Sequence, residues 1–543
     1  QAESLAAWLE RHDGVRDAAR GLVDTSPELS QARIGLLGLA AAAEVEPWEV
    51  IGLLLGEELA IGMDVPLDGG EPRVIAATRL ASPERAERLL LSIERASGVR
   101  RGESLDPDRV ESVAGIQVVH LAEGIRYARV DGGLIVATDP GLLEAALKMD
   151  VSAPTGVGSG TAYEAALERV PAAAPVVFYA TETFREAVLS SPDLPDRLPD
   201  PLSALLFGGV YEALRGADPP VAWIDAPREG VAGVAASVAF RALPEVPSWW
   251  GAFAPGELRV PAFDAAALPG FIGELRLARR PASLFTARES IMSLEGAGQF
   301  VEFCSTMSTL LGGLDFVEDV MGRVDGPLRL IALEGDPAAR RLDPTPELPD
   351  FALIAPLRVD PGMNLPARME SAALSALSFL NLERSRANQA TYLLGTETVE
   401  GTRVAVGRYT RPMGADPEVM LETGVDGNFE PTVAIFDQRL VFTTSLASMR
   451  RIGAALGSAP GAVGRSEDHG RVHVPALVTM LERNLEEMTA NRMLEENQTR
   501  EAAARDLRGM LDLLELFDSL ELDLVPHADG YTGRVRVTLR EVE

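Results

Sequence analysis

The stretch that decides the fold reads YARVDGGLIVATD over residues 127–139, and an echo, TVAIFDQRLVFTTS, follows at residues 432–445. In both, two runs of alternating apolar residues flank a short turn that begins with an aspartate. Asp131-Gly132-Gly133 suits a hairpin turn because aspartate and glycine tolerate positive φ. Each stretch ends at a residue suited to the N-cap of a helix, Asp139 or Ser445. We therefore predict strand, turn, strand and helix in each case.

Further segments recur around these two stretches in the same order, at an offset of roughly 270–305 residues. The first block reads helix, strand, strand, helix, and the last reads as a hairpin that closes each half. Gly115 aligns with Gly401 in this comparison, and Asp131 aligns with Asp437. The matched segments are 48–56, 59–65 and 73–80 with 316–322, 328–333 and 351–359; 113–120 with 399–406; 176–184 with 471–479; and 230–240 with 530–539.

The strands turn quickly into one another without regular crossover helices, which favours antiparallel sheets with helices on one face. The sequence therefore predicts an α+β protein made of two tandem copies of a mainly antiparallel sheet with helices packed on it. The first copy covers 1–243, a linker rich in Pro and Gly covers 244–269, and the second copy covers 270–543 with a long helical region at 478–520. The alternative is that the runs match only because many α+β chains contain them.

The two copies differ at their beginnings. The second copy begins with a strand at 271–278, whereas the first begins at Gln1, already inside the matching helix. The first strand of the first copy is therefore apparently missing, and we expect it to have been removed or to come from another chain. The mostly polar segment 486–505 can project as a helical hairpin or lie as a solvated surface helix.

The charge balance excludes several classes of partner. The chain has 543 residues with 81 acidic and 50 basic side chains, a formal net charge of -31. Nucleic acids and anionic membrane surfaces attract clustered positive charge, so neither is expected as a partner. The most apolar segment, 34–43, is followed by Glu44, Glu46 and Glu49, so we expect a buried helix there and no transmembrane helix.

The residues that usually carry chemistry are few. Cys304 is the only cysteine and lies in a helical pattern, where we expect it to be a buried apolar side chain. Lys148 is the only lysine and lies in no nucleotide-binding motif. His469 and His473 are four residues apart on a predicted strand, about 13 Å, too far to bind one metal ion. His120 and His527 are expected to be structural.

No motif of a known catalytic class is present. The chain has no nucleophile elbow, no dinucleotide-binding glycine motif after a strand, no Walker motif and no zinc-protease motif. Paired carboxylates are abundant in so acidic a chain, and the sequence singles out none of them. We therefore assign no catalytic, cofactor-binding or metal-ligating residue and predict no cofactor.

The segment 127–139 and its echo at 432–445 resemble a loosely defined group of uncharacterised exported bacterial proteins with an internally duplicated α+β unit. The resemblance would span most of the chain. It implies export and a duplicated sheet, and it implies no activity and no functional residue.

Three functions remain open. The first is a non-catalytic exported or envelope protein, periplasmic or extracellular in a bacterium, that acts as a scaffold, assembly subunit or binding module with other envelope proteins. The second is a carrier of an apolar ligand, such as a lipid, between sheet and helices. The third is a carboxylate- or metal-dependent hydrolase. The oligomeric state does not follow from the sequence.

Overall fold

The fold is taken from a computed structural model of the chain. The structure describes residues 40, 50, 53, 58–64, 73–80, 82–102, 104–121, 124–148, 161–172, 174, 176–190, 194–216, 220–225, 233–240, 249–253, 257–261, 263–336, 344–387, 389–409, 425, 427–456, 461–465, 467–527 and 530–540. The segment expected to be a buried helix, 34–43, lies outside these residues except at residue 40, as does Gly230 of the predicted closing hairpin.

Two compact units make up the described chain. The first comprises residues up to 170 together with 179–191, and the second comprises 171–178 and the residues from 192 onward. This division follows packing and differs in position from the repeat boundary at 243, which rests on similarity of sequence and stays a prediction.

The first unit contains a six-stranded sheet in which the neighbouring strands run antiparallel. Across the sheet the strands are β1 (Glu58–Asp64), β2 (Arg73–Arg79), β8 (Gly133–Ala137), β7 (Arg126–Val130), β6 (Ile116–His120) and β5 (Val110–Val113). A separate small hairpin, β3 (Arg100–Arg101) and β4 (Ser104–Leu105), precedes β5 in the chain. The helices are α5 (Pro83–Ala96), α6 (Pro140–Lys148), α7 (Thr161–Leu167) and α8 (Glu182–Leu189).

Helices α5 and α6 cover opposite faces of this sheet, because successive residues of a strand point to opposite sides. Leu90 of α5 packs in a buried cluster with Tyr127 and Leu134. Leu143 of α6 packs with Ala128 and Ala137, the neighbours of opposite parity. Helices therefore lie on both faces, and the expectation of helices on one face was wrong.

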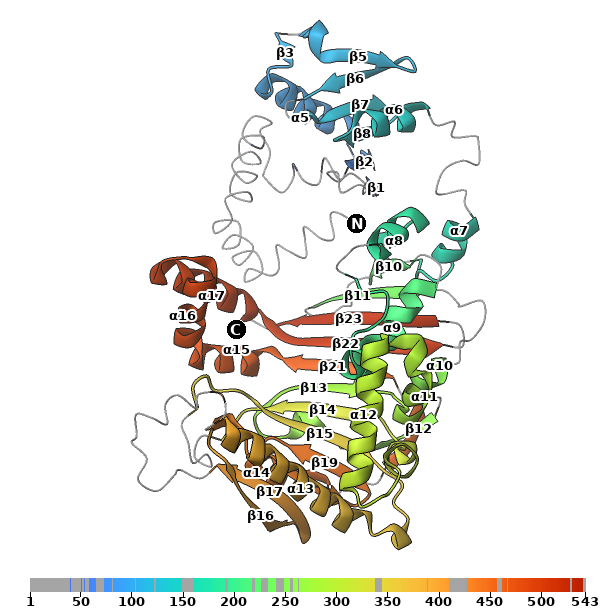
Figure 1. Ribbon diagram of the computed structural model, residues 1–543. Helices are drawn as coiled ribbons and strands as arrows, with labels where there is room; N and C mark the ends of the chain where they lie inside the picture. The colour runs from blue at the N-terminus through green and yellow to red at the C-terminus, as the bar shows by residue number, and fades with distance from the viewer. Residues whose placement is uncertain are drawn as a thin grey trace. The chain divides into compact units, whose positions relative to one another are not determined.

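The second unit is built on a 13-stranded sheet. Its strands run antiparallel from β16 to β10. Across the sheet they are β16 (Tyr392–Val399), β17 (Thr402–Tyr409), β18 (Thr432–Phe436), β19 (Arg439–Thr443), β15 (Asp350–Pro356), β14 (Leu328–Leu333), β13 (Phe271–Leu277), β21 (Asp468–His473), β22 (Phe517–His527), β23 (Gly530–Leu539), β11 (Gly233–Phe240), β10 (Val221–Ile224) and β9 (Val176–Tyr179). Figure 1 shows β11 to β19 side by side.

The helices of the second unit form two groups in the chain, one before β16 and one after β19. The first group is α9 (Pro201–Gly216), α10 (Trp250–Phe253), α11 (Pro281–Ile291), α12 (Leu294–Leu310) and α13 (Leu365–Arg386). The second is α14 (Leu446–Leu456), α15 (Val474–Arg483), α16 (Leu485–Glu496) and α17 (Arg500–Leu514). Short helical turns lie at Pro107–Arg109 in the first unit and, in the second, at Ala265–Ala267, Phe316–Val320, Met321–Arg323 and Pro361–Met363.

Part of the large sheet has the same strand order as the sheet of the first unit. The series β16, β17, β18, β19, β15, β14 matches β5, β6, β7, β8, β2, β1, with antiparallel neighbours in both. Helices α13 and α14 follow β15 and β19 as α5 and α6 follow β2 and β8. The predicted α+β class with antiparallel sheets is confirmed. The common order is what a tandem duplication requires, and the duplication itself stays a prediction.

The closing hairpins bring the two halves of the sequence into one sheet. Strand β11, from the first half, pairs with β23, the last strand of the chain, from Gly233↔Thr538 to Phe240↔Tyr531. Strands β9 to β11 thus continue the sheet that the second half begins. As a result one register runs through strands far apart in the sequence.

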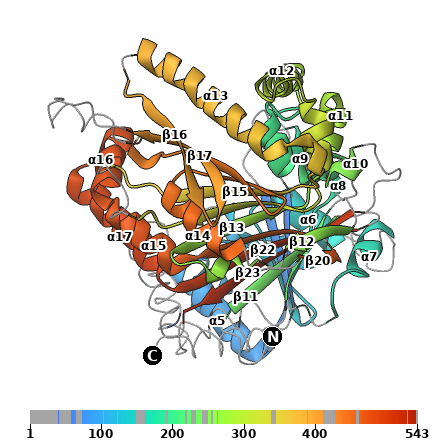
Figure 2. The same ribbon diagram turned by 90° about the horizontal axis from the view of Figure 1, so that it is seen from below.

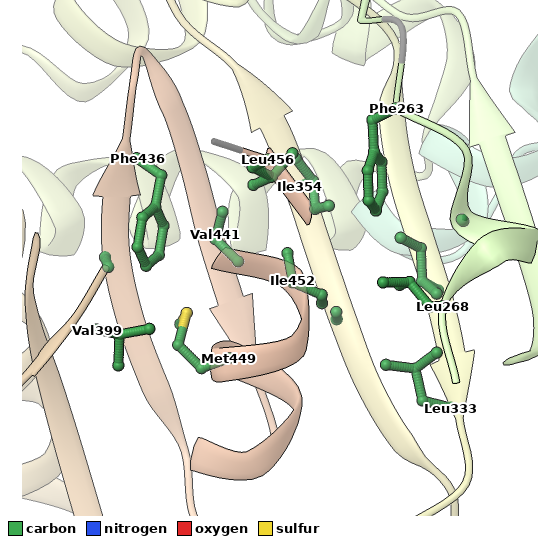
Figure 3. Close-up of a cluster of buried hydrophobic side chains, with 14 of the residues drawn as sticks. Phe263, Leu268, Leu333, Ile354, Val399, Phe436, Val441, Met449, Ile452 and Leu456 are labelled. Carbon is green, nitrogen blue, oxygen red and sulfur yellow. The ribbon is translucent and has the colours of Figure 1, made fainter. Parts of the chain in front are cut away.

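The main core lies under α14. Strand residues Ile331, Ile354 and Val441 have exposed fractions of 0 to 1% and pack against Met449 and Ile452 of the helix. Figure 3 shows Ile354 and Val441 on the strands, with Met449 and Ile452 of the helix beside them. Helix α14 begins at the predicted cap, since the Ser445 hydroxyl accepts a hydrogen bond from the Ser448 N–H at 3.1 Å.

Helices α13 and α9 pack on the opposite face. Leu365 and Met369 of α13 lie in a buried cluster with Ile435 of β18. Leu205 and Leu206 of α9 pack on Leu277. Figure 2 shows α9, α12 and α13 on one side of the sheet and α14 on the other.

The segments predicted as linker and as long helix both differ from the prediction. The linker contains a helix and a strand, and the helical region is divided into three helices. In 244–269, strand β12 (Glu257–Pro261) pairs with β20 (Gly461–Arg465). Trp249 and Trp250 are buried in a cluster that includes Tyr531. In 478–520, α15, α16 and α17 follow one another. The helical region ends at Leu514, earlier than predicted, and β22 begins at Phe517.

The aligned glycines Gly115 and Gly401 occupy equivalent two-residue turns. Gly115 has φ +82° and follows Ala114 in the β5–β6 turn, and Gly401 has φ +76° and follows Glu400 in the β16–β17 turn. Gly132 in the β7–β8 turn also has positive φ, as its sequence predicted. Positive φ at both turn residues is the geometry that fits the twist of a hairpin.

We predict that Gly401→Ala lowers the free energy of unfolding by about 1–2 kcal/mol, because a Cβ strains the left-handed backbone. No atom lies within 4 Å of the Cβ that the substitution adds, so the loss comes from the backbone alone. Gly395→Ala, also with open space but without positive φ, is the control and should change stability by less. Urea denaturation of both variants measures the difference; equal losses would contradict the turn assignment.

Candidate functional site

The large sheet has one face on which the strands carry only uncharged residues in two neighbouring rows. The register places the members of each row directly opposite one another. The first row, from β18 to β10, is Val433, Phe442, Leu353, Leu330, Leu275, Gly470, Leu522, Val535, Ala236 and Ile224. The second row, from β15 to β23, is Phe351, Ala332, Gly273, Val472, Leu520 and Val537. We call these two rows the apolar face.

Much of the apolar face is accessible to solvent. Exposed fractions are 40% for Leu353, 45% for Leu522 and 41% for Leu520. Phe351, Phe442, Leu330 and Val535 lie between 36% and 39%. Large contiguous apolar surfaces are uncommon on soluble monomers and typically mark binding sites.

Helix α9 covers the row that lies next to the apolar face. Leu205 and Leu206 of α9 pack with Leu277, Leu328 and Ala355, whose exposed fractions are 6 to 8%. The apolar face thus begins where the cover of α9 ends. On this one face of the sheet, α9 therefore buries one row, whereas side chains in the two neighbouring rows remain exposed.

A buried ion pair holds α9 in this position. Arg279 is 2% exposed, and its guanidinium lies 2.6 Å from Asp468 Oδ1 and over the ring of Phe253. The same guanidinium donates to the backbone carbonyls of Leu205 at 2.8 Å and Leu206 at 3.2 Å. Because both carbonyls belong to α9, the pair ties the helix to the end of β13 and to β21.

The opposite face of β13, β21, β22 and β23 is charged. Two rows there alternate in sign for most of their length. In register they are Glu274, Arg471, Glu521 and Arg536, and then Arg276, His469, Asp523 and Arg534. Arg534 also pairs with Asp225 at 2.7 Å. Opposite charges directly across neighbouring strands stabilise a sheet, and these side chains are half-buried.

The histidines noted in the sequence lie apart from any metal-binding geometry. His469 and His473 both lie on β21, as predicted, and His469 Nδ1 is 2.7 Å from Asp523 Oδ1 within the charged rows. His120 ends β6 beside Glu111, and His527 ends β22 beside Thr532. Within the described ranges no group of three His, Cys, Asp or Glu residues is arranged to hold a metal ion.

Cys304 is a buried side chain of the core, and Lys148 forms an ion pair within its own helix. Cys304 is buried in α12, with its Sγ 3.9 Å from the sulfur of Met321. Burial, reinforced by the charge of Asp315, raises the pKa of the Cys304 thiol to about 11. Lys148 forms an ion pair with Glu144 one turn earlier in α6.

Among the described residues of the first unit, one carboxylate is buried. Glu94 of α5 is fully buried and is paired with Arg100 at 2.5 Å and Arg129 at 2.6 Å. The Tyr127 hydroxyl donates to the same carboxylate, and burial, followed by this hydrogen bond, raises the pKa of Tyr127. The charge of Glu94 is therefore fully matched, which is the arrangement of a structural contact between helix and sheet.

The chain has no match among family models, curated proteins or solved structures. Of the helices that the structure describes, none combines the length and apolar character needed to cross a bilayer.

The apolar face was missed by the sequence analysis. Each of its strands contributes only one or two residues, and the alternation along a strand shows one apolar side without saying whether a helix covers it. The alternating charges of β21, β22 and β23 were a usable signal. They mark one side of these strands as charged and so place Leu520 and Leu522 on the other side.

We predict that neighbouring residues of β15 respond differently to truncation. Ile354 is 1% exposed under α14, so Ile354→Ala should lower the free energy of unfolding by about 2–5 kcal/mol. Leu353 is 40% exposed on the apolar face, so Leu353→Ala should cost less than about 1 kcal/mol. Chemical denaturation measures both, and similar losses would show that the two faces have been assigned wrongly.

We also predict that Cys304 is unreactive in the folded protein. With a pKa of about 11, very little thiolate is present at pH 8, and the side chain is only 4% exposed. A colorimetric disulfide reagent should therefore label the native chain at least 100-fold more slowly than the chain in denaturant. Rapid labelling of native protein at pH 8 would contradict this environment.

Proposed function

We propose that the protein is a non-catalytic binding module of the bacterial envelope, acting as a scaffold or assembly subunit, and that the apolar face is its contact surface. The observation that carries the proposal is the continuous uncharged row from Val433 to Ile224. Charged and apolar side chains are segregated to opposite faces of the same strands. A surface meant only for solvent has no need of this segregation.

The energies available at such a surface are sufficient for specific binding. Fully burying one leucine or phenylalanine side chain contributes about 1.5–3 kcal/mol. The side chains of the apolar face are already partly buried, so each supplies a fraction of this value on contact. Several residues acting together, among them Leu353, Phe442 and Leu522, can still supply the central cluster of an interface.

The chemistry of the partner follows from how this chain covers the same surface. Next to the apolar face, the cover consists of helix α9, whose leucines lie directly on the strands. Helix α13 covers Ile435 near the other end. A partner that presents an apolar helical surface without charges at its centre fits, because a buried charge would find no counter-ion in either row.

The other two functions have less support. A carrier requires unfilled space between sheet and helices, and side chains from both layers pack together under α9, α13 and α14. A hydrolase requires converging catalytic groups. The buried carboxylates Glu94, Asp350 and Asp468 are each held by arginine or hydroxyl partners instead.

We predict site-specific cross-linking to a partner protein from the apolar face. A photoreactive phenylalanine analogue at position 353 or 522, in the bacterium that makes the protein, should give a discrete protein adduct. The matched control is position 494 on α16, where Leu494 is 83% exposed and lies outside the apolar face. Adducts are separated by gel and the cross-linked peptide is identified by mass spectrometry.

A second substitution ties the adduct to the apolar face. Leu330→Asp places a charge directly opposite Leu353 and should reduce the adduct at 353 at least tenfold. Lipid adducts in place of protein would favour the carrier function. Equal labelling at 353, 522 and 494 would contradict the proposal.

A further inference from the structure

Strand β1 is an end strand with an unusual composition. Residues 59–63 read LAIGM, and all five are exposed, with fractions of 63% for Ile61 and 57% for Met63. Of the strands that the structure describes, only β2 pairs with β1. The other edge of β1 therefore has backbone N–H and C=O groups without a described strand beside them.

Two other end strands, β5 and β16, carry charge within the strand. Strand β5 contains Glu111, which pairs with Arg126. Strand β16 contains Glu397, which pairs with Arg408 and Arg450. Charged residues on an edge protect a sheet from pairing with further strands. The exposed middle of β1 has no such protection.

The strand that matches β1 in the second unit shows what can occupy this edge. In the common order β1 corresponds to β14, and β14 pairs with β15 on one side and with β13 on the other. Strand β13 is antiparallel to β14 from Leu277↔Leu328 to Phe271↔Leu333. On the far side β13 pairs with β21, which corresponds in order to β9.

Strand β9 repeats the composition of β1. It reads VVFY, is an end strand of the large sheet, and carries Phe178 at an exposed fraction of 58%. Thus the counterparts of both neighbours of β13 are end strands whose exposed middle is uncharged, residues 59–63 in β1 and Val176–Tyr179 in β9. The end strands β5 and β16, which correspond to each other in the common order, are the charged ones. A charge in the middle of the strand therefore distinguishes β5 and β16 from β1 and β9.

We propose that the edge of β1 beside which no described strand lies receives an added antiparallel strand from a partner polypeptide, in the position that β13 takes beside β14. Main-chain hydrogen bonds would supply affinity, and the exposed side chains of Leu59, Ile61 and Met63 would select alternating apolar residues. This site is separate from the apolar face and does not depend on it.

Charge indicates a different polypeptide and not a second copy of this chain. Antiparallel pairing of two β1 strands about Ile61 would place Glu58 of each opposite Asp64 of the other, and like charges directly opposite are destabilising. On the β2 side, the residues opposite these acids are Arg79 and Arg73. The partner strand should therefore have an apolar centre and neutral or basic ends.

The test uses the full chain and a labelled synthetic peptide with the sequence of residues 270–279 carrying Glu274→Leu, GFIGLLRLAR, which removes the acid from its centre and keeps a basic end. Saturating peptide should slow hydrogen–deuterium exchange of the amides in 58–64 at least tenfold and leave 328–333 unchanged. A control peptide with proline in place of Gly273 and Leu275 loses two backbone donors and should give no protection. Peptide binding is followed by fluorescence anisotropy.

Two variants of the protein complete the test. Ile61→Lys should weaken the peptide at least tenfold, and Leu494→Lys, on exposed α16, should leave the affinity unchanged. Exchange on the unaltered protein keeps the test valid if Ile61→Lys folds poorly. Absence of protection in 58–64, or equal affinity for Ile61→Lys, overturns the proposal. A dimer by sedimentation that Ile61→Lys dissociates overturns the choice of partner.

Discussion

The antiparallel register that joins the strands from β18 to β10 is the constraint on which the second unit depends. Because side chains alternate across a strand, a shift of one residue at any pairing would exchange the apolar rows for the charged ones. Two features of one sheet face fix this register. Charged pairs such as Arg534 with Asp225 lie on one part of that face, and the core under α14 lies on another part. The apolar face is a consequence of this register.

The pairing of β11 with β23 extends that constraint across the whole sequence. It joins strands that lie about 300 residues apart and makes one surface from segments of both halves. The Arg279–Asp468 pair has a similar role, since it binds the carbonyls of α9 to strands of the second half. The apolar face and the helix that borders it are therefore products of long-range contacts.

Several local features could be predicted because they depend on nearby residues. The hairpin turns at Gly115, Gly132 and Gly401, the cap at Ser445 and the antiparallel strand pairs follow from short patterns. Residue type alone does not guarantee a cap, since Ser82 stands at the N-cap position of α5 but its hydroxyl forms no capping hydrogen bond. The order of strands also agrees with the repeated segments, because each hairpin is formed by adjacent elements.

The sequence by itself determined the fold class, the turns and the burial of Cys304, since these depend on composition and on neighbours along the chain. Only the tertiary structure decided which strands share a sheet, on which faces the helices lie, and which apolar side chains remain exposed. The physical reason is that burial belongs to a surface assembled from distant strands. Leu353 and Ile354 are adjacent in the sequence, and only the positions of α9 and α14 make one of them exposed and the other buried.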